Sequence, residues 1–387
     1  MSRDETELLQ LLQDLIRIDS VNPVLTNIGT GELEIAQYIG NYLEKMGLEV
    51  TYQDINSKRA NVVGILKGEG GGKTIMLNGH TDTVGIEGMN IDPFNPKFEN
   101  GKVYGRGALD MKSGLAATIM AVQAIMNAKI KLKGDVILAF VADEENLSLG
   151  TERLVKDYSA DGAIICEPTD LQITMAHKGF AWIRIEIFGK AAHGSRPEEG
   201  VDAIVKAGKV LMEIDYLEKN ILPQKQHPLL GAPSIHASLI KGGTELSTYP
   251  HYCKIELERR TLPKENRNDV VEEINKIIET ISSEDRQFKA DFNVYFYRSA
   301  LEVSQNHSIV HSLDKAYRRV RTQKSRFVGG SYWTDAALLT EAGIPTVIFG
   351  PRGEGPHSAI EYVDFESVIA TTEILKETIQ DFCGVLH

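Results

Sequence analysis

The chain has 387 residues, of which 42% are hydrophobic, and this is enough for two domains with sizeable cores. Its formal net charge is −12. Nucleic acids and anionic membranes attract clustered Lys and Arg, so this charge argues against either as the main partner and favours metal ions or small cationic groups.

The cysteines Cys166, Cys253 and Cys383 are widely spaced and form no CxxC pair. This odd, scattered set predicts neither a disulfide framework nor a thiolate zinc site, and a reducing cytoplasm is the simplest compartment for it. The N-terminal stretch is acidic and amphipathic, and no apolar run reaches the ~18 residues that span a bilayer. We therefore expect a soluble cytoplasmic protein without an export signal.

The outer parts of the chain have the pattern of an α/β domain. Residues 5–17 and 31–47 carry apolar positions at helical spacing. Short continuous apolar runs lie between turn signals, namely NVVGIL, TIMLNG, DVILAFVA, DGAIIC and PTVIFG. Such runs, alternating with helices like SGLAATIMAVQAIMNA, indicate a largely parallel sheet that is covered on both faces.

The middle of the chain follows a different pattern. Between about 179 and 298 the predicted order is strand FAWIRIEIFG, helix VDAIVKAGKVLMEIDYLEKN, strands SIHASLIKG and YCKIELERRTL, helix NDVVEEINKIIETISS and strand DFNVYFY. This β-α-β-β-α-β order is the ferredoxin-like arrangement, and Asn266 or Asn268 can cap its second helix. We expect a small domain at 179–298 inserted into a domain made of 1–178 and 299–387.

The stretch GEGGGKT at 68–74 looks like a phosphate-binding loop, but the motif would require a glycine at Lys67. It also precedes a predicted strand, whereas a phosphate-binding loop follows one. We interpret it as a hairpin turn.

Polar side chains follow the predicted strands of the outer domain. His80 and Asp82 end TIMLNG, Asp143, Glu144 and Glu145 follow DVILAFVA, Glu167 follows DGAIIC, and a Gly/Pro loop after PTVIFG leads to His357. A further acid, Asp110, lies in GRGALDMKSG, whose glycines suit a tight loop before a helix. Because ligands bind at the carboxyl edge of open α/β sheets, we expect these side chains to converge in one crevice.

Several carboxylates buried together repel one another, and divalent cations would reverse that cost. Two histidines with three or more carboxylates and no cysteine suit Zn²⁺, with Co²⁺ or Mn²⁺ as alternatives. Because the set exceeds the three protein ligands usual for one catalytic zinc ion, it predicts a pair of ions with a bridging carboxylate.

In this order, the motifs NGHTDTV, GRGALDMKSGLAA, ADEENLSLG, ICEPTD and GPHSAIEYV resemble a di-zinc amidohydrolase and peptidase family. The family includes acetylornithine deacetylase, succinyl-diaminopimelate desuccinylase, aminoacylase and carboxypeptidase G. The resemblance covers nearly the whole chain and implies a mainly parallel-sheet zinc-hydrolase catalytic domain with an inserted ferredoxin-like lid and dimerisation domain. It further implies that Asp110 bridges the two ions, that His80 and Glu167 complete one site, and that Glu145 and His357 complete the other. A cis peptide between Asp110 and Met111 is implied as well.

Two acids near the predicted ligands have places in the chemistry. Glu144 directly precedes a ligand, so we expect it beside a metal-bound water as the general base, which later returns a proton to the leaving amine. Asp82 lies two residues after His80 and can reach back to the imidazole N–H, which fixes the tautomer of the ring. The family assigns both roles. For Asp143 we expect a structural or capping role.

The inserted domain supplies two further candidates. His193, in GKAAHGSRPEEG, matches the family histidine that reaches across a dimer interface to stabilise the oxyanion of the tetrahedral intermediate. Arg260, in ELERRTLP, matches the arginine that binds the substrate carboxylate, a role that its planar fork of donors suits. Its neighbour Arg259 fits an exposed strand arginine better. Ser247 stands where many relatives have asparagine, which weakens any transfer of substrate identity.

These features predict a homodimeric, metal-dependent hydrolase of a linear amide in an N-acyl amino acid, similar to acetylornithine deacetylase or succinyl-diaminopimelate desuccinylase. A dipeptidase or carboxypeptidase of the same family is the alternative, with a short peptide as substrate. A two-metal phosphoesterase would use similar ligands but has no use for Arg260. A non-catalytic binding protein would have no use for Glu144.

Overall fold

The computed structural model describes residues 1–386, which form two compact units. The large unit consists of Met1–Met175, Val303–Val328 and the chain from Thr334 onward. The small unit consists of Ala176–Glu302 together with the short segment Gly329–Trp333. Sequence alone had placed the small domain at 179–298, without that second segment.

A nine-stranded sheet has the order β1-β2-β6-β3-β7-β15-β8-β13, with β14 paired to β8. Most of this sheet forms the centre of the large unit, whereas β13 and the last residues of β8 and β14 fall in the small unit. Its strands are β1 (Glu49–Asn56), β2 (Arg59–Leu66), β3 (Ile75–His80), β6 (Val136–Val141), β7 (Gly162–Ile165), β8 (Ile173–His177), β13 (Leu301–Glu302), β14 (Phe327–Gly330) and β15 (Thr346–Ile348). The neighbours β6, β3, β7 and β15 run parallel to one another. The predicted α/β fold with a mainly parallel sheet is confirmed.

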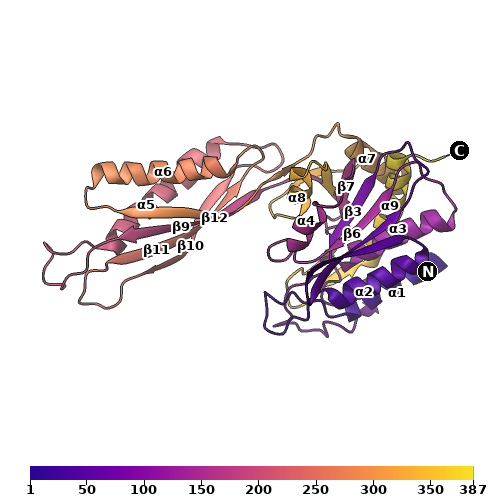
Figure 1. Ribbon diagram of the computed structural model, residues 1–387, viewed down its shortest axis with the longest axis horizontal. Helices are drawn as coiled ribbons and strands as arrows, with labels where there is room; N and C mark the ends of the chain where they lie inside the picture. Colours follow the sequence, from indigo (N-terminus) through magenta and orange to yellow (C-terminus); the bar gives the residue numbers. More distant parts are fainter. Residues whose placement is uncertain (387) are drawn as a thin grey trace. The chain divides into compact units, whose positions relative to one another are not determined.

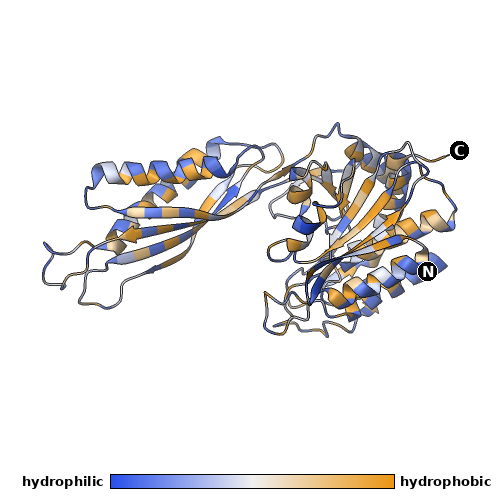
Figure 2. Ribbon diagram, viewed as in Figure 1, coloured by the Kyte–Doolittle hydropathy of each residue, from blue (hydrophilic) through white to orange (hydrophobic). Residues whose placement is uncertain are grey.

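The central strands are apolar along their whole length because both of their faces are covered. Every residue of β3, β6 and β7 is buried, and Figure 2 shows hydrophobic residues running continuously along the middle of this sheet. Strands that alternated in polarity would leave polar side chains against a helix, so the continuous apolar runs match the doubly covered sheet.

Helices pack on both sides of the sheet. They are α1 (Arg3–Arg17), α2 (Leu33–Met46), α3 (Lys112–Asn127), α4 (Leu149–Leu154), α7 (Ser308–Arg321), α8 (Ala336–Glu341) and α9 (Phe365–Cys383). Figure 1 shows α1, α2, α3 and α9 on one side and α4 and α8 on the other. Helix α3 contacts β3 and α9, whereas α4 contacts β6 and α8. Among residues 1–386, no helix is both long and apolar enough to cross a bilayer.

The hairpin predicted at 68–74 is wrong. Strands β2 and β3 flank this segment, but β6 lies between them, antiparallel to β2 and parallel to β3. The segment therefore passes over the start of β6. Its backbone N–H groups at Glu69 and Gly70 donate to the carbonyls of Leu132 and Lys133, which precede that strand. The two strands are adjacent in sequence but not in space, because β6, from later in the chain, separates them.

A second sheet in the large unit has the order β16-β17-β5-β4 and is antiparallel. It comprises β4 (Lys97–Glu99), β5 (Lys102–Tyr104), β16 (Gly353–Glu354) and β17 (Tyr362–Asp364). The sequence pattern did not indicate these very short strands. They matter because the loop between β16 and β17 carries His357, and pairing of β17 with β5 anchors that loop next to the segment that leads to Asp110.

The small unit has the predicted β-α-β-β-α-β order. Its elements are β9 (Gly179–Phe188), α5 (Ala203–Tyr216), β10 (Ser234–Gly242), β11 (Tyr252–Thr261), α6 (Arg267–Glu284) and β12 (Ala290–Arg298). The sheet is antiparallel with the order β10-β11-β9-β12, and Figure 1 shows α5 and α6 on one of its faces. Asn266 is the N-cap of α6 and forms a capping box with Asp269. Of the two predicted caps, Asn266 is the one used.

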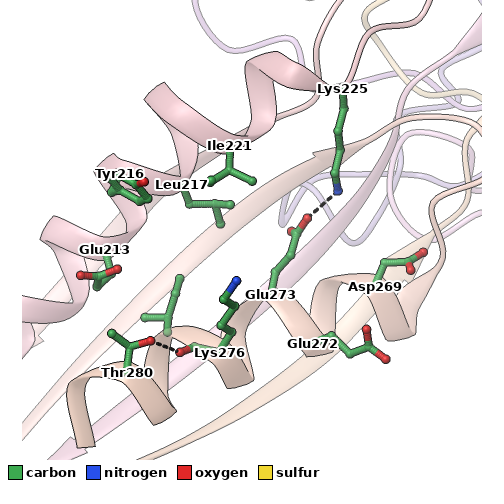
Figure 3. A pocket seen from close by; sticks show the side chains of 11 residues that line it. Glu213, Tyr216, Leu217, Ile221, Lys225, Asp269, Glu272, Glu273, Lys276 and Thr280 are labelled. Atoms are coloured by element: carbon green, nitrogen blue, oxygen red, sulfur yellow. Dashed lines mark hydrogen bonds and ion pairs between the residues drawn. The ribbon is translucent and has the colours of Figure 1, made fainter. Parts of the chain in front are cut away.

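The small unit also has a cavity of about 370 Å³ between α6 and the helical segment that continues α5. Figure 3 shows acidic and basic side chains around it, with Lys225 bonded to Glu273. None of the site residues predicted from the sequence lines this cavity. It therefore adds nothing to the predicted chemistry.

The expectation that Arg259 is an exposed strand arginine is wrong. Its side chain is fully buried, and it donates to Glu265 and Glu273 from the helix face of β11. Burial along β11 alternates, so Arg259 lies on the same face as Leu257, and Arg260 points to the other face. The sequence itself indicates this position, because the apolar residues Cys253, Ile255 and Leu257 alternate along the strand and Arg259 is the next residue on their face.

Candidate metal centre

The predicted ligands come from separate strand ends of the large unit and meet at one edge of its sheet. His80 ends β3, Glu145 follows β6, Glu167 follows β7, and His357 lies in the loop after β15 and β16. Because β6, β3, β7 and β15 are parallel, their carboxyl ends lie at the same edge. Asp110 joins them from the turn before α3.

The carboxylate of Asp110 faces both histidines, one with each oxygen. His80 Nε2 lies 3.2 Å from Asp110 Oδ1 and 3.4 Å from Glu167 Oε1. On the other side, His357 Nε2 lies 3.3 Å from Asp110 Oδ2 and 3.1 Å from Glu145 Oε1. Two ligand atoms of one tetrahedral zinc ion, each about 2.0–2.1 Å from it, lie about 3.3 Å apart. The donor set therefore fits two divalent cations that share Asp110.

Glu144 lies within the same cluster. Its carboxylate belongs to a group with His80 and Glu167 whose ligand atoms all lie within 4.8 Å of one another. A second such group contains His80, Asp110 and Glu145. Within residues 1–386, however, the Glu144 carboxylate makes no hydrogen bond or ion pair with another protein group. It is the free carboxylate of the centre.

The acidic groups have strongly shifted pKa values because they are buried together. Burial raises the pKa of Glu144 well above its usual value, and the charge of Glu167 raises it further. Burial also raises the pKa of Glu167, as do the charges of Asp110 and Glu145. Divalent cations would neutralise this mutual repulsion, so the charge pattern agrees with the donor geometry.

The two histidines differ in exposure. His80 is buried, whereas the His357 side chain is 53% exposed. Hydrogen bonds with Asp110 and Glu145 raise the pKa of His357 to about 10. His357 therefore lies on the solvent-exposed side of the centre, and His80 lies on its buried side.

Asp82 contacts more of the centre than the sequence indicated. His80 Nδ1 lies 2.9 Å from the main-chain oxygen of Asp82 and 3.5 Å from its carboxylate. The carboxylate itself accepts the backbone N–H groups of Glu144 and Glu145, each at 3.1 Å. Asp82 thus orients the imidazole mainly through its main-chain oxygen, and its carboxylate holds the turn that carries both glutamates.

A buried ion-pair network beneath the centre was missed by the sequence analysis. The fully buried Arg59 donates to Glu32 through Nε at 2.8 Å and lies 2.8 Å from Asp143 Oδ1 through its terminal nitrogen. Burial and the charge of Asp82 raise the pKa of Glu32 to about 7, although the hydrogen bond from Arg59 lowers it. Asp143 has the structural role that we expected, but its partner is an arginine that no motif singled out.

Two contacts outside the predicted site fix Asp110 in place. Glu361 accepts the backbone N–H groups of Leu109 and Asp110 at 2.9 and 3.0 Å, and it pairs with Arg106. On α3, a Cβ at Gly114 would lie 2.0 Å from the carbonyl oxygen of Cys166, so glycine allows the close approach of α3 to the end of β7. The peptide between Asp110 and Met111 is cis, as the resemblance implied.

The remaining predicted residues lie in the small unit. His193 is exposed in the loop after β9, and its Nδ1 lies 2.8 Å from Ser195 Oγ. Arg260 is 31% exposed, pairs with Glu258 at 2.6 Å and lies over the ring of Phe180. These contacts leave part of each polar group open to a ligand.

Comparison with known proteins identifies the family of the chain and agrees with the fold. Residues 76–381 match the model of peptidase family M20/M25/M40, so the chain belongs to this family of metal-dependent hydrolases. It is 30% identical to an N-formyl-4-amino-5-aminomethyl-2-methylpyrimidine deformylase from Bacillus subtilis, covering 98% of this chain and 95% of the relative. It is 28% identical to an acetylornithine deacetylase from Myxococcus xanthus, covering 90% and 92%. The aminopeptidase PepT from Bacillus cereus has the same fold, with a TM-score of 0.82, 22% identity and coverage of 98% and 99%.

Proposed function

We propose that the protein hydrolyses the linear amide of an N-acyl amino acid, with two divalent ions, preferably Zn²⁺, at the candidate centre. His80 and Glu167 would hold one ion, Glu145 and His357 the other, and Asp110 both. The observation that carries the proposal is the position of Asp110, whose two oxygens face two separate histidine and glutamate pairs. The scattered, unpaired cysteines support a cytoplasmic location.

When bound, the ions supply Lewis-acid polarisation of the amide carbonyl and make water easier to deprotonate. Glu144 takes the proton of the attacking water, since its carboxylate is free and burial raises its pKa above the usual value of a glutamate. The same carboxyl group then gives that proton to the amine as the C–N bond breaks. Asp82 holds the His80 imidazole and the Glu144 backbone in fixed positions during both steps.

The small unit would contribute to substrate binding and to the transition state. Arg260 offers a partly exposed guanidinium that suits the substrate carboxylate. His193 would act from the partner of a homodimer as a hydrogen-bond donor to the oxyanion. Both roles follow the family resemblance.

The relatives suggest which amides to test. The Bacillus subtilis relative is named for removal of a formyl group from an aminomethylpyrimidine, and the Myxococcus xanthus relative for deacetylation of acetylornithine. N-acetyl, N-succinyl and N-formyl amino acids, dipeptides and a formylated aminomethylpyrimidine should therefore be assayed together by amine release. Hydrolysis of the pyrimidine amide alone would replace the N-acyl amino acid proposal with deformylation.

Arg260→Ala should weaken binding of substrates that carry a carboxylate. A charged hydrogen bond contributes about 1.5–3 kcal/mol, so KM should rise about 10- to 100-fold with a much smaller change in kcat. Steady-state kinetics on an N-acyl amino acid and on its amide, which lacks the carboxylate, measure this effect. Arg184→Ala is the matched control, since Arg184 is a partly exposed arginine of the same sheet. An equal rise in KM for both substrates would contradict the assignment.

A mixed dimer tests whether His193 acts across an interface. His193→Ala and Glu144→Gln subunits, each with its own tag, would be co-expressed and the heterodimer purified. If His193 serves the partner's centre, one of the two centres is intact, and activity should return to about half of wild type. Sedimentation establishes the dimer first. A heterodimer as inactive as its two parents, or an active monomer, would contradict the role in trans.

A further inference from the structure

Asn22 joins the ends of two strands below the candidate centre. Its Nδ2 donates to Asp82 Oδ2 at 2.9 Å and to Asp143 Oδ1 at 3.0 Å. Its Oδ1 accepts the backbone N–H of Val24 at 3.0 Å. Since two carboxylates face one end of the amide and an N–H faces the other, only one orientation of this fully buried side chain satisfies all three contacts.

Both carboxylates that Asn22 joins control the same turn. Asp82 accepts the N–H groups of Glu144 and Glu145. Asp143 is the residue immediately before them, and its second oxygen accepts the N–H of Leu149 at 3.3 Å. Displacement of Asn22 would therefore weaken two sets of contacts that hold the turn, those of Asp82 and those of Asp143.

The turn needs such support because its backbone is unusual. Asp143 has a φ of +72° and Ser148 a φ of +62°, in the left-handed region that side chains with a Cβ rarely adopt. Such conformations persist where the surroundings over-determine them, and they collect at functional sites. Here the surroundings are Asn22, Arg59 and Glu32, each within hydrogen-bond distance of Asp143.

The neutral side chain of Asn22 suits its buried position between carboxylates. Asp82, Asp143 and Glu32 already surround one buried cation, Arg59. A neutral amide donates to two of these carboxylates without adding charge of either sign. An isosteric aspartate would instead place three carboxylates within contact distance, which is unfavourable in a buried site.

We propose that Asn22 is a positioning residue for hydrolysis, which acts through Asp82 and Asp143 to hold the turn that presents Glu144 and Glu145. The inference rests on the proposed function, because hydrolysis is what requires Glu144 and Glu145 to be held in place. It does not require Asn22 to touch substrate or metal.

Asn22→Asp and Asn22→Ala test the proposal. Each should lower kcat about 10- to 100-fold, the range for residues that orient groups of a metal site, with little change in KM. In the metal-free protein, hydrogen exchange of a peptide spanning 142–150 should become about tenfold faster, because the amides of Glu144 and Glu145 lose a fixed acceptor. The alanine variant adds no charge, so it keeps the test valid if the aspartate variant does not fold.

Thr371→Val is the control, since it removes a buried hydrogen bond within α9 and leaves the turn intact. It should lower the thermal midpoint without changing kcat or exchange at 142–150. Wild-type kcat and unchanged exchange in both Asn22 variants would overturn the positioning role. If the wild-type protein loaded with metal hydrolysed none of the amides in the substrate screen, the proposed function would fail instead, and the exchange experiment would still decide whether Asn22 holds the turn.

Discussion

Glu144→Gln is expected to lower kcat by about 100- to 10,000-fold, the range that a general acid–base group contributes. Glutamine keeps the size of the side chain but cannot take the proton of the attacking water. Because the Glu144 carboxylate bonds to no other group within residues 1–386, its replacement should not disturb the fold. The measurement is kcat on the best amide of the substrate screen, together with metal content and thermal midpoint.

Retention of metal is the decisive companion measurement for this variant. If Glu144 is the base and not a ligand, Glu144→Gln should bind about two ions per chain, as wild type does. Loss of an ion would make Glu144 a ligand, in line with its closeness to His80 and Glu167. Wild-type activity would contradict both roles. Glu99→Gln is the control for mutation of an exposed glutamate.

Asp110→Ala is expected to abolish hydrolysis by a different route, with a loss of about 1,000-fold or more in kcat, because both ions lose the ligand that they share. Metal content should fall below two ions per chain. The variant lacks the carboxylate whose oxygens lie 3.2 Å from His80 Nε2 and 3.3 Å from His357 Nε2, so each histidine loses the ligand next to it. Elemental analysis after gel filtration and steady-state kinetics measure the two effects.

The reading of Asp110 as a shared ligand would be wrong if Asp110→Ala kept two tightly bound ions. Asp215→Ala is the matched control, because Asp215 is an exposed carboxylate that pairs with Lys219 on the surface of the small unit. It should change neither metal content nor kcat. Exposed pairs of this kind contribute little to stability, so the control should also keep its thermal midpoint.

The convergence of the site could be predicted because buried parallel strands leave a strong signal. Runs such as DVILAFVA can only be continuous and apolar if both faces are covered, and in such sheets the carboxyl ends share one edge. His80, Glu145 and Glu167 therefore came together as expected. His357 was harder to place, since the two-residue strand β16 and the short strand β17 hold its loop.

The supports of the site could not be predicted in the same way. Arg59 and Glu32 look like ordinary surface charges, because nothing in their local sequence indicates that they pair in the interior. Asn22 lies far along the chain from both of its carboxylate partners, and a single asparagine carries no periodic signal. The face of Arg259, in contrast, follows from the alternation of buried and less buried residues along β11.

The position of β15 has a consequence for how the chain reaches its final state. This strand lies between β7 and β8, which end 181 and 169 residues before it begins, and the whole of β9 to β12 is made in between. As the chain emerges from the ribosome, His80, Asp110, Glu145 and Glu167 are present early, but a gap remains in the sheet until residues 346–348 arrive. Pairing across so long a stretch closes slowly. The chain thus gains its last candidate ligand, His357, only after this late strand has been added.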